Sequence, residues 1–187
     1  LLGNAGQSFS VHRFTRDLRS QGIPVAKDTL HAYFAHLEDA FLIQPVWVAS
    51  GSERRRMVNP RKVYPADPAL IAVFDRSGRA NLGHALETCV ALALLRRGAE
   101  ISYVRTRDGF EVDFLVRDED GAEALIQVCA EPDDPAALAR ELRALAAATV
   151  EHPRAKRHLI TLRPEVVQAV PRGVAVHAAA VWLLGER

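Results

Sequence analysis

The order of helices and strands in residues 82–162 limits the possible folds more than any other feature of the sequence. Gly98 ends a long helical pattern, and Arg107-Asp108-Gly109 is a tight-turn sequence between two β segments. The order helix, three strands, helix, strand predicts a mixed fold of the α/β (α+β) class. The expected elements are a helix over 82–97, strands over 101–106, 110–116 and 124–129, a helix over 135–149 and a strand over 158–162.

The segment 110–116 alternates strictly between two kinds of side chain. Phe110, Val112, Phe114 and Val116 occupy one set of positions, and Glu111, Asp113 and Leu115 occupy the other. Because successive side chains of a strand point to opposite faces, we expect the first set to share one face of the sheet. Residues 174–177 are expected to form a last strand, and residues 181–184 a closing apolar segment.

The first part of the chain predicts a winged helix-turn-helix. Ser10 is a good N-cap for a helix over 11–20, and a second helix is expected over 29–41. A β segment over 42–49, an Arg-rich polar turn over 50–60 and a strand over 61–64 follow, in the order of a helix pair and a hairpin. We therefore expect a winged helix-turn-helix in residues 1–75 and a second domain in residues 79–187, with a hinge at Arg76–Ala80.

Polar side chains stand within otherwise apolar elements of the second domain. Glu87 lies in the middle of the helix over 82–97, where an isolated buried carboxylate would be costly. Asp113 lies on the strand over 110–116. Gln127 and Cys129 share one face of the next strand, 124–129. The pattern predicts that these side chains form one site.

This pattern resembles the PD-(D/E)xK nuclease core and would make the second domain restriction-endonuclease-like, with the order αβββαβ. In that superfamily, acidic groups hold a divalent metal and a lysine orients or activates the attacking water. Glu87 and Asp113 match and are the candidate metal ligands, but the last element here reads Gln127-Val128-Cys129. Gln127 removes a negative charge, and Cys129 cannot replace an ammonium group. Glu111 could supply a substitute ligand.

Three interpretations of the site follow from that departure. Glu87, Asp113 and Gln127 could form a buried polar network kept from the ancestral fold. They could line a binding groove that no longer cleaves. They could also form a residual metal-dependent nuclease acting on DNA, with Glu111 as the substitute ligand.

Several motifs together resemble one family, and the resemblance covers nearly the whole chain. They are the segment from Thr29 to Ile43, Lys62-x-Tyr64-x-x-Asp67, Leu86-Glu87-x-x-Val90, Glu111-Val112-Asp113-Phe114 and Ile126-Gln127-Val128. The family is the C-terminal domain of unknown function that follows the ATPase module of prokaryotic AAA-type ATPases. It implies a winged helix, a degenerate nuclease-like fold and an upstream ATPase module that binds ATP and Mg²⁺. This chain has no Gly-x-x-x-x-Gly-Lys-Ser/Thr loop, so we expect no cofactor within it.

Nucleic-acid binding could rest only on a local patch, because the net charge of the chain is +1. A basic cluster lies in and beside the turn of the hairpin and is opposed only by Glu53. Its members, with two residues of the preceding helical segment, are Arg54, Arg55, Arg56, Arg61, Lys62, Lys27 and His31. Such a cluster could contact phosphates, dock on the upstream ATPase module or another protein, or simply face solvent.

The sequence therefore predicts a non-catalytic interaction module, with nucleic acid or a protein as its partner. The segment LLGNAGQSFS has no signal-peptide pattern, and no apolar run is long enough for a membrane helix. With only two cysteines and no initiator Met, we expect a cytoplasmic protein without disulfides, and a chain that begins inside a longer protein.

Overall fold

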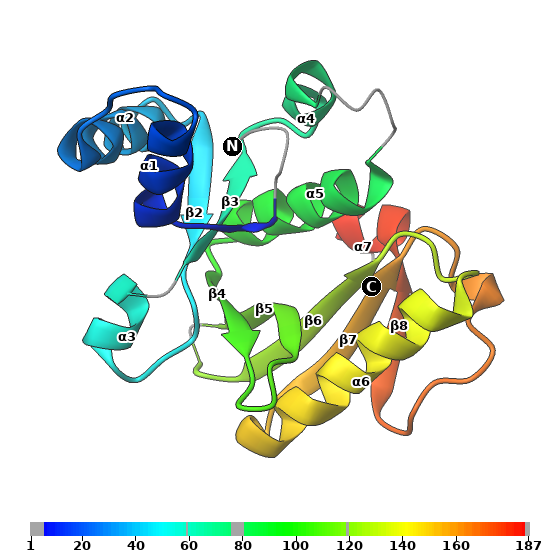
Figure 1. Cartoon of the computed structure of the whole chain (residues 1–187). Coiled ribbons are helices and arrows are strands. Elements are labelled where there is room, and N and C mark those ends of the chain that lie inside the picture. The colour runs from blue at the N-terminus through cyan, green and yellow to red at the C-terminus, as the bar shows by residue number, and fades with distance from the viewer. Residues whose placement is uncertain (1–5, 59, 76–80, 119, 186–187) are drawn as a thin grey trace.

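The fold was derived from a computed structural model, which describes residues 6–58, 60–75, 81–118 and 120–185. It is a mixed α+β structure with two sheets (Figure 1). The first part contains β1 (Ser8–Phe9), α1 (Val11–Ser20), α2 (Lys27–Asp39), β2 (Ile43–Val46), α3 (Glu53–Val58), β3 (Arg61–Pro65) and α4 (Ala69–Phe74). The second contains α5 (Leu82–Arg96), β4 (Glu100–Arg105), β5 (Glu111–Arg117), β6 (Glu123–Cys129), α6 (Pro135–Glu151), β7 (Lys156–Thr161), a 3-10 turn (Pro164–Val166), β8 (Val174–Ala178) and α7 (Ala179–Leu184).

The N-terminal sheet is antiparallel, with the strand order β1-β3-β2. Helices α1 and α2 precede it, and the Ser10 side chain accepts a hydrogen bond from the Arg13 amide at the start of α1, as a capping residue does. The expectation of a polar turn over 50–60 is wrong in one respect, because residues Glu53–Val58 form the short helix α3. The hinge expected at Arg76–Ala80 lies outside the described residues.

The larger sheet has the order β4-β5-β6-β7-β8, with β4 to β6 antiparallel and β6 to β8 parallel. The order α5, β4, β5, β6, α6, β7 agrees with the order expected from the sequence. Helix α6 covers one face of this sheet, and α5 and α7 cover the other (Figure 1). Asn81 caps α5, while Asp134 and Pro135 begin α6.

The two sheets meet where the chain leaves β2. The Tyr103 amide of β4 donates to the Trp47 carbonyl at 2.9 Å, and the Ala49 amide donates to the Tyr103 carbonyl at 2.7 Å. One apolar cluster crosses from the first part of the chain into the second, so the two parts share a core. Its members include Val46, Val48, Tyr64, Leu86, Val90, Tyr103, Phe114, Ile126 and Ile160.

Strand β5 does not alternate strictly, contrary to the expectation. Val104 pairs with Val112 and Ser102 pairs with Leu115, so β5 has one extra residue between these pairs. As a result Val112 packs in the cluster under α6, whereas Phe114 packs in the cluster under α5. The extra residue is a β-bulge, a feature that redirects side chains at one end of a strand.

Candidate functional site

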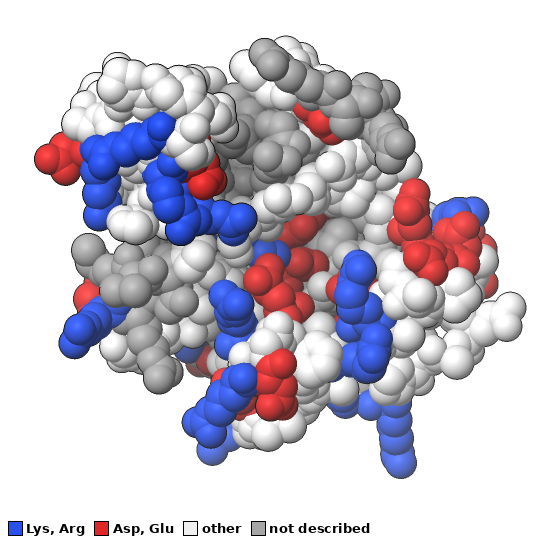
Figure 2. Space-filling model, in the orientation of Figure 1, with Lys and Arg blue, Asp and Glu red and all other residues white. Residues whose placement is uncertain are grey.

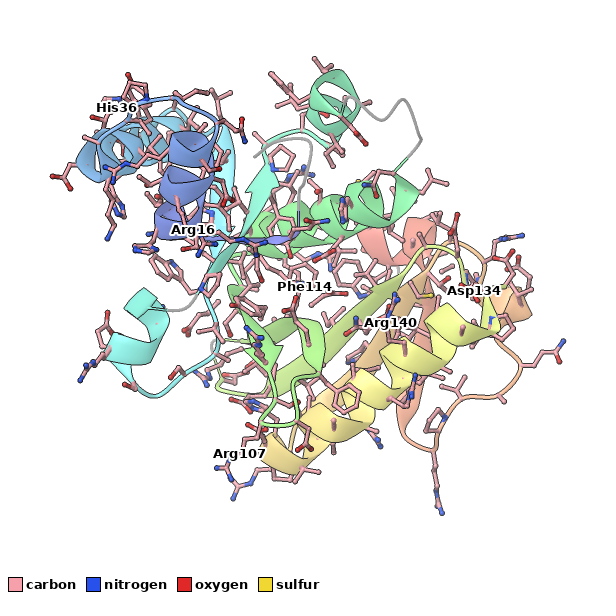
Figure 3. All side chains as sticks on the ribbon, viewed as in Figure 1. Arg16, His36, Arg107, Phe114, Asp134 and Arg140 are labelled. Carbon is pink, nitrogen blue, oxygen red and sulfur yellow. The ribbon has the colours of Figure 1, made fainter. Side chains whose placement is uncertain are left out.

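A cleft of about 740 Å³ lies at the bulged end of β5. Strand β1, the beginning of α5, strands β5 and β6, and α6 border it. Figure 2 shows acidic side chains in a hollow at the centre of this face, with basic side chains on both sides. The charged residues that line the cleft are Arg13, Lys62, Glu87, Glu111, Asp113, Glu131, Arg140 and Glu141. Arg140 on α6 and Arg16 on α1 are labelled in Figure 3.

Lys62 of β3 is the centre of the charged cluster. Its Nζ lies 2.8 Å from Asp113 Oδ1, 3.0 Å from Glu87 Oε1 and 3.0 Å from Glu111 Oε1. Its side chain is only 3% exposed. Burial alone would lower the pKa of Lys62, but the surrounding carboxylates raise it well above its ordinary value. Lys62 is therefore a buried, permanently charged cation.

Glu87 projects from α5 and is enclosed on several sides. Its Oε1 accepts hydrogen bonds from Lys62 Nζ and, at 2.7 Å, from the Tyr64 hydroxyl. The backbone of Gly6 packs against the same carboxyl, since a Cβ at Gly6 would lie 2.7 Å from Glu87 Oε2. Burial and the charge of Asp113 raise the pKa of Glu87 to about 8, although Lys62 opposes this shift. Burial thus favours the protonated form of Glu87, while the bonds from Lys62 and Tyr64 favour the ionised form.

Asp113 joins two strands where their ordinary pairing stops. The pairing of β5 with β6 reaches Phe114 and Ile126. Beyond that pair, the Val128 amide donates to Asp113 Oδ2 at 3.0 Å, and the Asp113 amide donates to Gln127 Oε1 at 3.3 Å. The two side chains thus satisfy backbone groups that a regular ladder would have paired. Asp113 has one carboxylate oxygen on Lys62 and the other on the backbone of β6.

Gln127 is held on both sides of its amide. Its Oε1 accepts from the Asp113 amide, and its Nε2 donates to Glu141 Oε2 on α6. Glu141 Oε1 in turn accepts from Arg140, and burial raises the pKa of Glu141. A neutral amide with both ends engaged in this way is a structural link between β5, β6 and α6.

Cys129 does not contribute to the charged cluster. It is buried at the end of β6, and it is not among the residues that line the cleft. Burial raises the pKa of its thiol to about 11. The structure therefore brings together Glu87, Asp113, Glu111 and Gln127 of the expected site, but leaves Cys129 out.

These residues do not fit a divalent metal. The ammonium of Lys62 already stands between the three carboxylates, and burial raises the pKa of Glu87, which weakens it as a metal ligand. Within the described ranges, no group of three or more His, Cys, Asp or Glu side chains is arranged to hold a metal ion. A metal at this position would have to displace a buried lysine that has three partners.

The expected basic cluster divides into exposed and buried members. Lys27 and His31 of α2 and Arg54 and Arg56 of α3 are exposed, and Arg55 also belongs to α3. Arg61 is half-buried beside Phe34 and Trp47. The inclusion of Lys62 in this set is wrong, because Lys62 points inward to the carboxylates.

Sequence reasoning missed Lys62, Tyr64, Gly6 and Glu141 as members of the site. A weak signal existed for two of them. Glu141 is the single acidic residue of the expected helix 135–149, and Lys62 stands beside Val63 and Tyr64 in a strand that reads as buried. Nothing in the sequence marks the approach of Gly6 to Glu87, because that contact depends on where β1 crosses the fold.

Within the described part of the chain, every helix is too short or too polar to cross a bilayer. No curated protein and no solved structure matches the sequence. A family model described as "Domain of unknown function (DUF4143)" matches residues 82–179, from the start of α5 to the start of α7, which is more than half of the 187 residues. The match covers Glu87, Glu111, Asp113, Gln127 and Glu141, and the chain belongs to the DUF4143 family.

Proposed function

We propose that this chain is a non-catalytic interaction module of a prokaryotic AAA-type ATPase, and that it binds nucleic acid through the basic residues of its N-terminal part. The observation that carries the proposal is the position of Lys62. Its ammonium stands among Glu87, Glu111 and Asp113, at the point where a nuclease of the resembling superfamily would hold its metal. The cluster then stabilises the fold instead of activating water.

The order of elements supports a winged helix followed by a nuclease-like domain. Helices α1 and α2 precede the hairpin of β2 and β3, with α3 in the connection that would form the wing. In the second part, α5 and the mixed five-stranded sheet bring Glu87 and Asp113 to one cleft. ATP and Mg²⁺ binding belong, in this proposal, to an ATPase module upstream of the chain and not to the residues described above.

Nucleic acid is favoured as the partner because exposed basic side chains flank the cleft. Arg13 of α1 and Arg140 of α6 line the cleft, and Arg54 and Arg56 are exposed on α3. Figure 2 shows basic side chains on both sides of the central acidic hollow. The phosphates of a nucleic acid could contact the basic side chains on both sides of the hollow. Lys62 partly neutralises the carboxylates between them.

A salt titration of binding to a duplex oligonucleotide, followed by fluorescence anisotropy, tests this proposal. The triple variant Arg54→Ala/Arg55→Ala/Arg56→Ala should bind more weakly. Loss of up to three phosphate contacts should reduce the slope of log K against log salt by roughly 1 to 3. The matched control is Arg154→Ala, an exposed arginine in the turn after α6. Absence of binding at low salt would contradict the nucleic-acid proposal, and binding to the isolated ATPase module instead would favour a protein partner.

Residual nuclease activity is the second candidate, and one observation favours it. Glu87, Glu111 and Asp113 meet at one cleft, although they come from different elements. Supercoiled plasmid incubated with Mg²⁺ or Mn²⁺ should stay intact if Lys62 prevents metal binding. Nicking that disappears in Asp113→Ala would establish the nuclease.

A further inference from the structure

Arg61 of β3 is held by two aromatic rings. Its Cζ lies 4.6 Å from the ring centroid of Phe34 on α2 and 4.2 Å from that of Trp47, which follows β2. Phe34 is itself buried, and it stacks on Phe9 of β1. Contacts of this kind attract a guanidinium to the ring faces and restrict the orientation of its plane.

The N–H groups of this guanidinium remain available. Among the described residues, none accepts a hydrogen bond from the Arg61 side chain or forms an ion pair with it. Partial burial lowers the pKa of Arg61, and the charge of Glu38 opposes the shift. The cation is thus partly desolvated, and no described residue supplies it with a hydrogen-bonding anion.

Arg97 also stacks on an aromatic ring, but its N–H groups donate hydrogen bonds within the protein. Its Cζ lies 4.4 Å from the ring centroid of Trp182, and its Nη2 donates to the Trp182 carbonyl at 2.7 Å at the end of α7. Arg97 is therefore a stacked arginine with a structural role. Arg61 is also stacked on aromatic rings, but its N–H groups donate to none of the residues that the structure describes.

We propose that Arg61 is a dedicated phosphate-binding residue, which contacts the nucleic-acid backbone through its free N–H groups. This inference rests on the proposed function and goes further, because it selects one residue and one chemical group. A planar guanidinium can bind two phosphate oxygens at once, and fixing its plane in advance reduces the entropy lost on binding. Among the described side chains, no aromatic ring packs on Arg54 or Arg56 of α3, so these exposed arginines would act through charge alone.

The position of Arg61 suits a backbone that crosses the N-terminal part. Lys27, His31 and Phe34 occupy one stripe of α2, at spacings of four and three residues. Phe34 contacts Arg61, and Lys27 and His31 continue the stripe toward the exposed beginning of the helix. Glu38 lies at the other end of this stripe, so phosphates are expected on the Lys27 side of Arg61.

The deciding experiment compares Arg61→Lys with Arg97→Lys in the same oligonucleotide titration. Both substitutions keep the charge and remove a stacked guanidinium, and both variants are checked for folding by thermal melting. Arg61→Lys should weaken binding about tenfold and leave the salt slope nearly unchanged, because one bidentate contact is lost but no charge. Arg97→Lys should bind as the wild type does. Trp47→Ala, which removes one ring, should weaken binding without changing any charge.

Each outcome has a distinct meaning. If the wild type binds and Arg61→Lys binds equally well, Arg61 is not a dedicated phosphate ligand, while the proposed function stands. If the wild type binds no oligonucleotide, the proposed function and this inference both fail. A titration with inorganic phosphate separates the sources of the anion. Arg61-dependent binding of free phosphate without oligonucleotide binding would overturn the assignment to nucleic acid.

Discussion

Lys62 Nζ and Asp113 Oδ1 lie 2.8 Å apart, although 51 positions separate the two residues in the chain. This contact joins β3 of the N-terminal sheet to β5 of the larger sheet. Asp113 also accepts the Val128 amide, so a single carboxylate links three strands from two sheets. The contact makes the cluster around Lys62 part of the interface between the two sheets.

Replacing Lys62 with Met should strongly destabilise the protein. The substitution keeps a long apolar chain but leaves Asp113, Glu87 and Glu111 without their cation. Removing one partner of a buried ion pair typically costs about 3–5 kcal/mol. Urea unfolding measures the change, and Lys27→Met on the exposed surface of α2 is the control. A loss of less than about 1 kcal/mol would mean that the cluster does not support the fold.

Glu87→Gln should remove part of the pH dependence of stability. The pKa of Glu87 is raised from 4.5 to about 8 in the folded chain, so between these values the folded state keeps a proton that the unfolded state has lost. The free energy of unfolding therefore falls as pH rises from about 4.5 to about 8, by at most ~1.4 kcal/mol per pH unit. The stabilisation that comes from the raised pKa of Glu87 is fully present below pH 4.5. Urea unfolding of both proteins at pH 5 and pH 8 measures the difference, and an equal pH dependence in the variant would contradict the assignment.

Asp113→Asn should behave differently from Glu87→Gln at neutral pH. Gln resembles a protonated Glu87, so that variant should keep most of its stability at pH 7. Asn at 113 removes the carboxylate nearest to Lys62 and should cost about 3 kcal/mol or more. Urea unfolding of both variants at pH 7 shows which of them loses more free energy of unfolding. Equal losses would contradict the raised pKa of Glu87.

Several features of this site could be predicted from the sequence, and others could not. Glu87 and Asp113 were identifiable because a charged residue in an apolar helix or strand needs a partner. The β-bulge in β5 was not, because the alternation of residues 110–116 is regular in the sequence and only the pairing with β4 reveals the extra residue. The sequence places Lys62 in a basic cluster because several arginines lie near it in the chain. Which face of β3 is buried depends on how the two sheets pack, and no local pattern contains that information.

Phe41→Gly should stabilise the protein by about 1 kcal/mol. Phe41 follows α2 with φ 56°, a left-handed conformation that favours glycine, and the residue is 74% exposed. The Phe41 amide donates to the Glu38 carbonyl and the Leu42 amide to the Leu37 carbonyl, as in a Schellman motif. Glycine would relieve the strain and lose little buried surface. Thermal unfolding measures the effect, with Ala40→Gly, which should destabilise, as the control. A lower melting temperature in Phe41→Gly would contradict the assignment.

Gly6→Ala should destabilise the protein by about 1–3 kcal/mol. Gly6 has φ +73°, and an added Cβ would lie 2.7 Å from Glu87 Oε2. Either β1 or the Glu87 carboxyl must then move, which disturbs the bonds to Lys62 and Tyr64. Gly22→Ala is the matched control, since Gly22 has φ +78° and an added Cβ there meets nothing within 4 Å. Equal stability of the two variants would show that Gly6 does not enclose Glu87.

Calorimetric titration of the wild-type chain with Mn²⁺, combined with a plasmid-nicking assay, tests the central claim most directly. If Lys62 replaces the metal, the wild type should show no binding that depends on Asp113 and no strand scission. The result that would contradict the claim is saturable Mn²⁺ binding together with nicking, both abolished by Asp113→Ala.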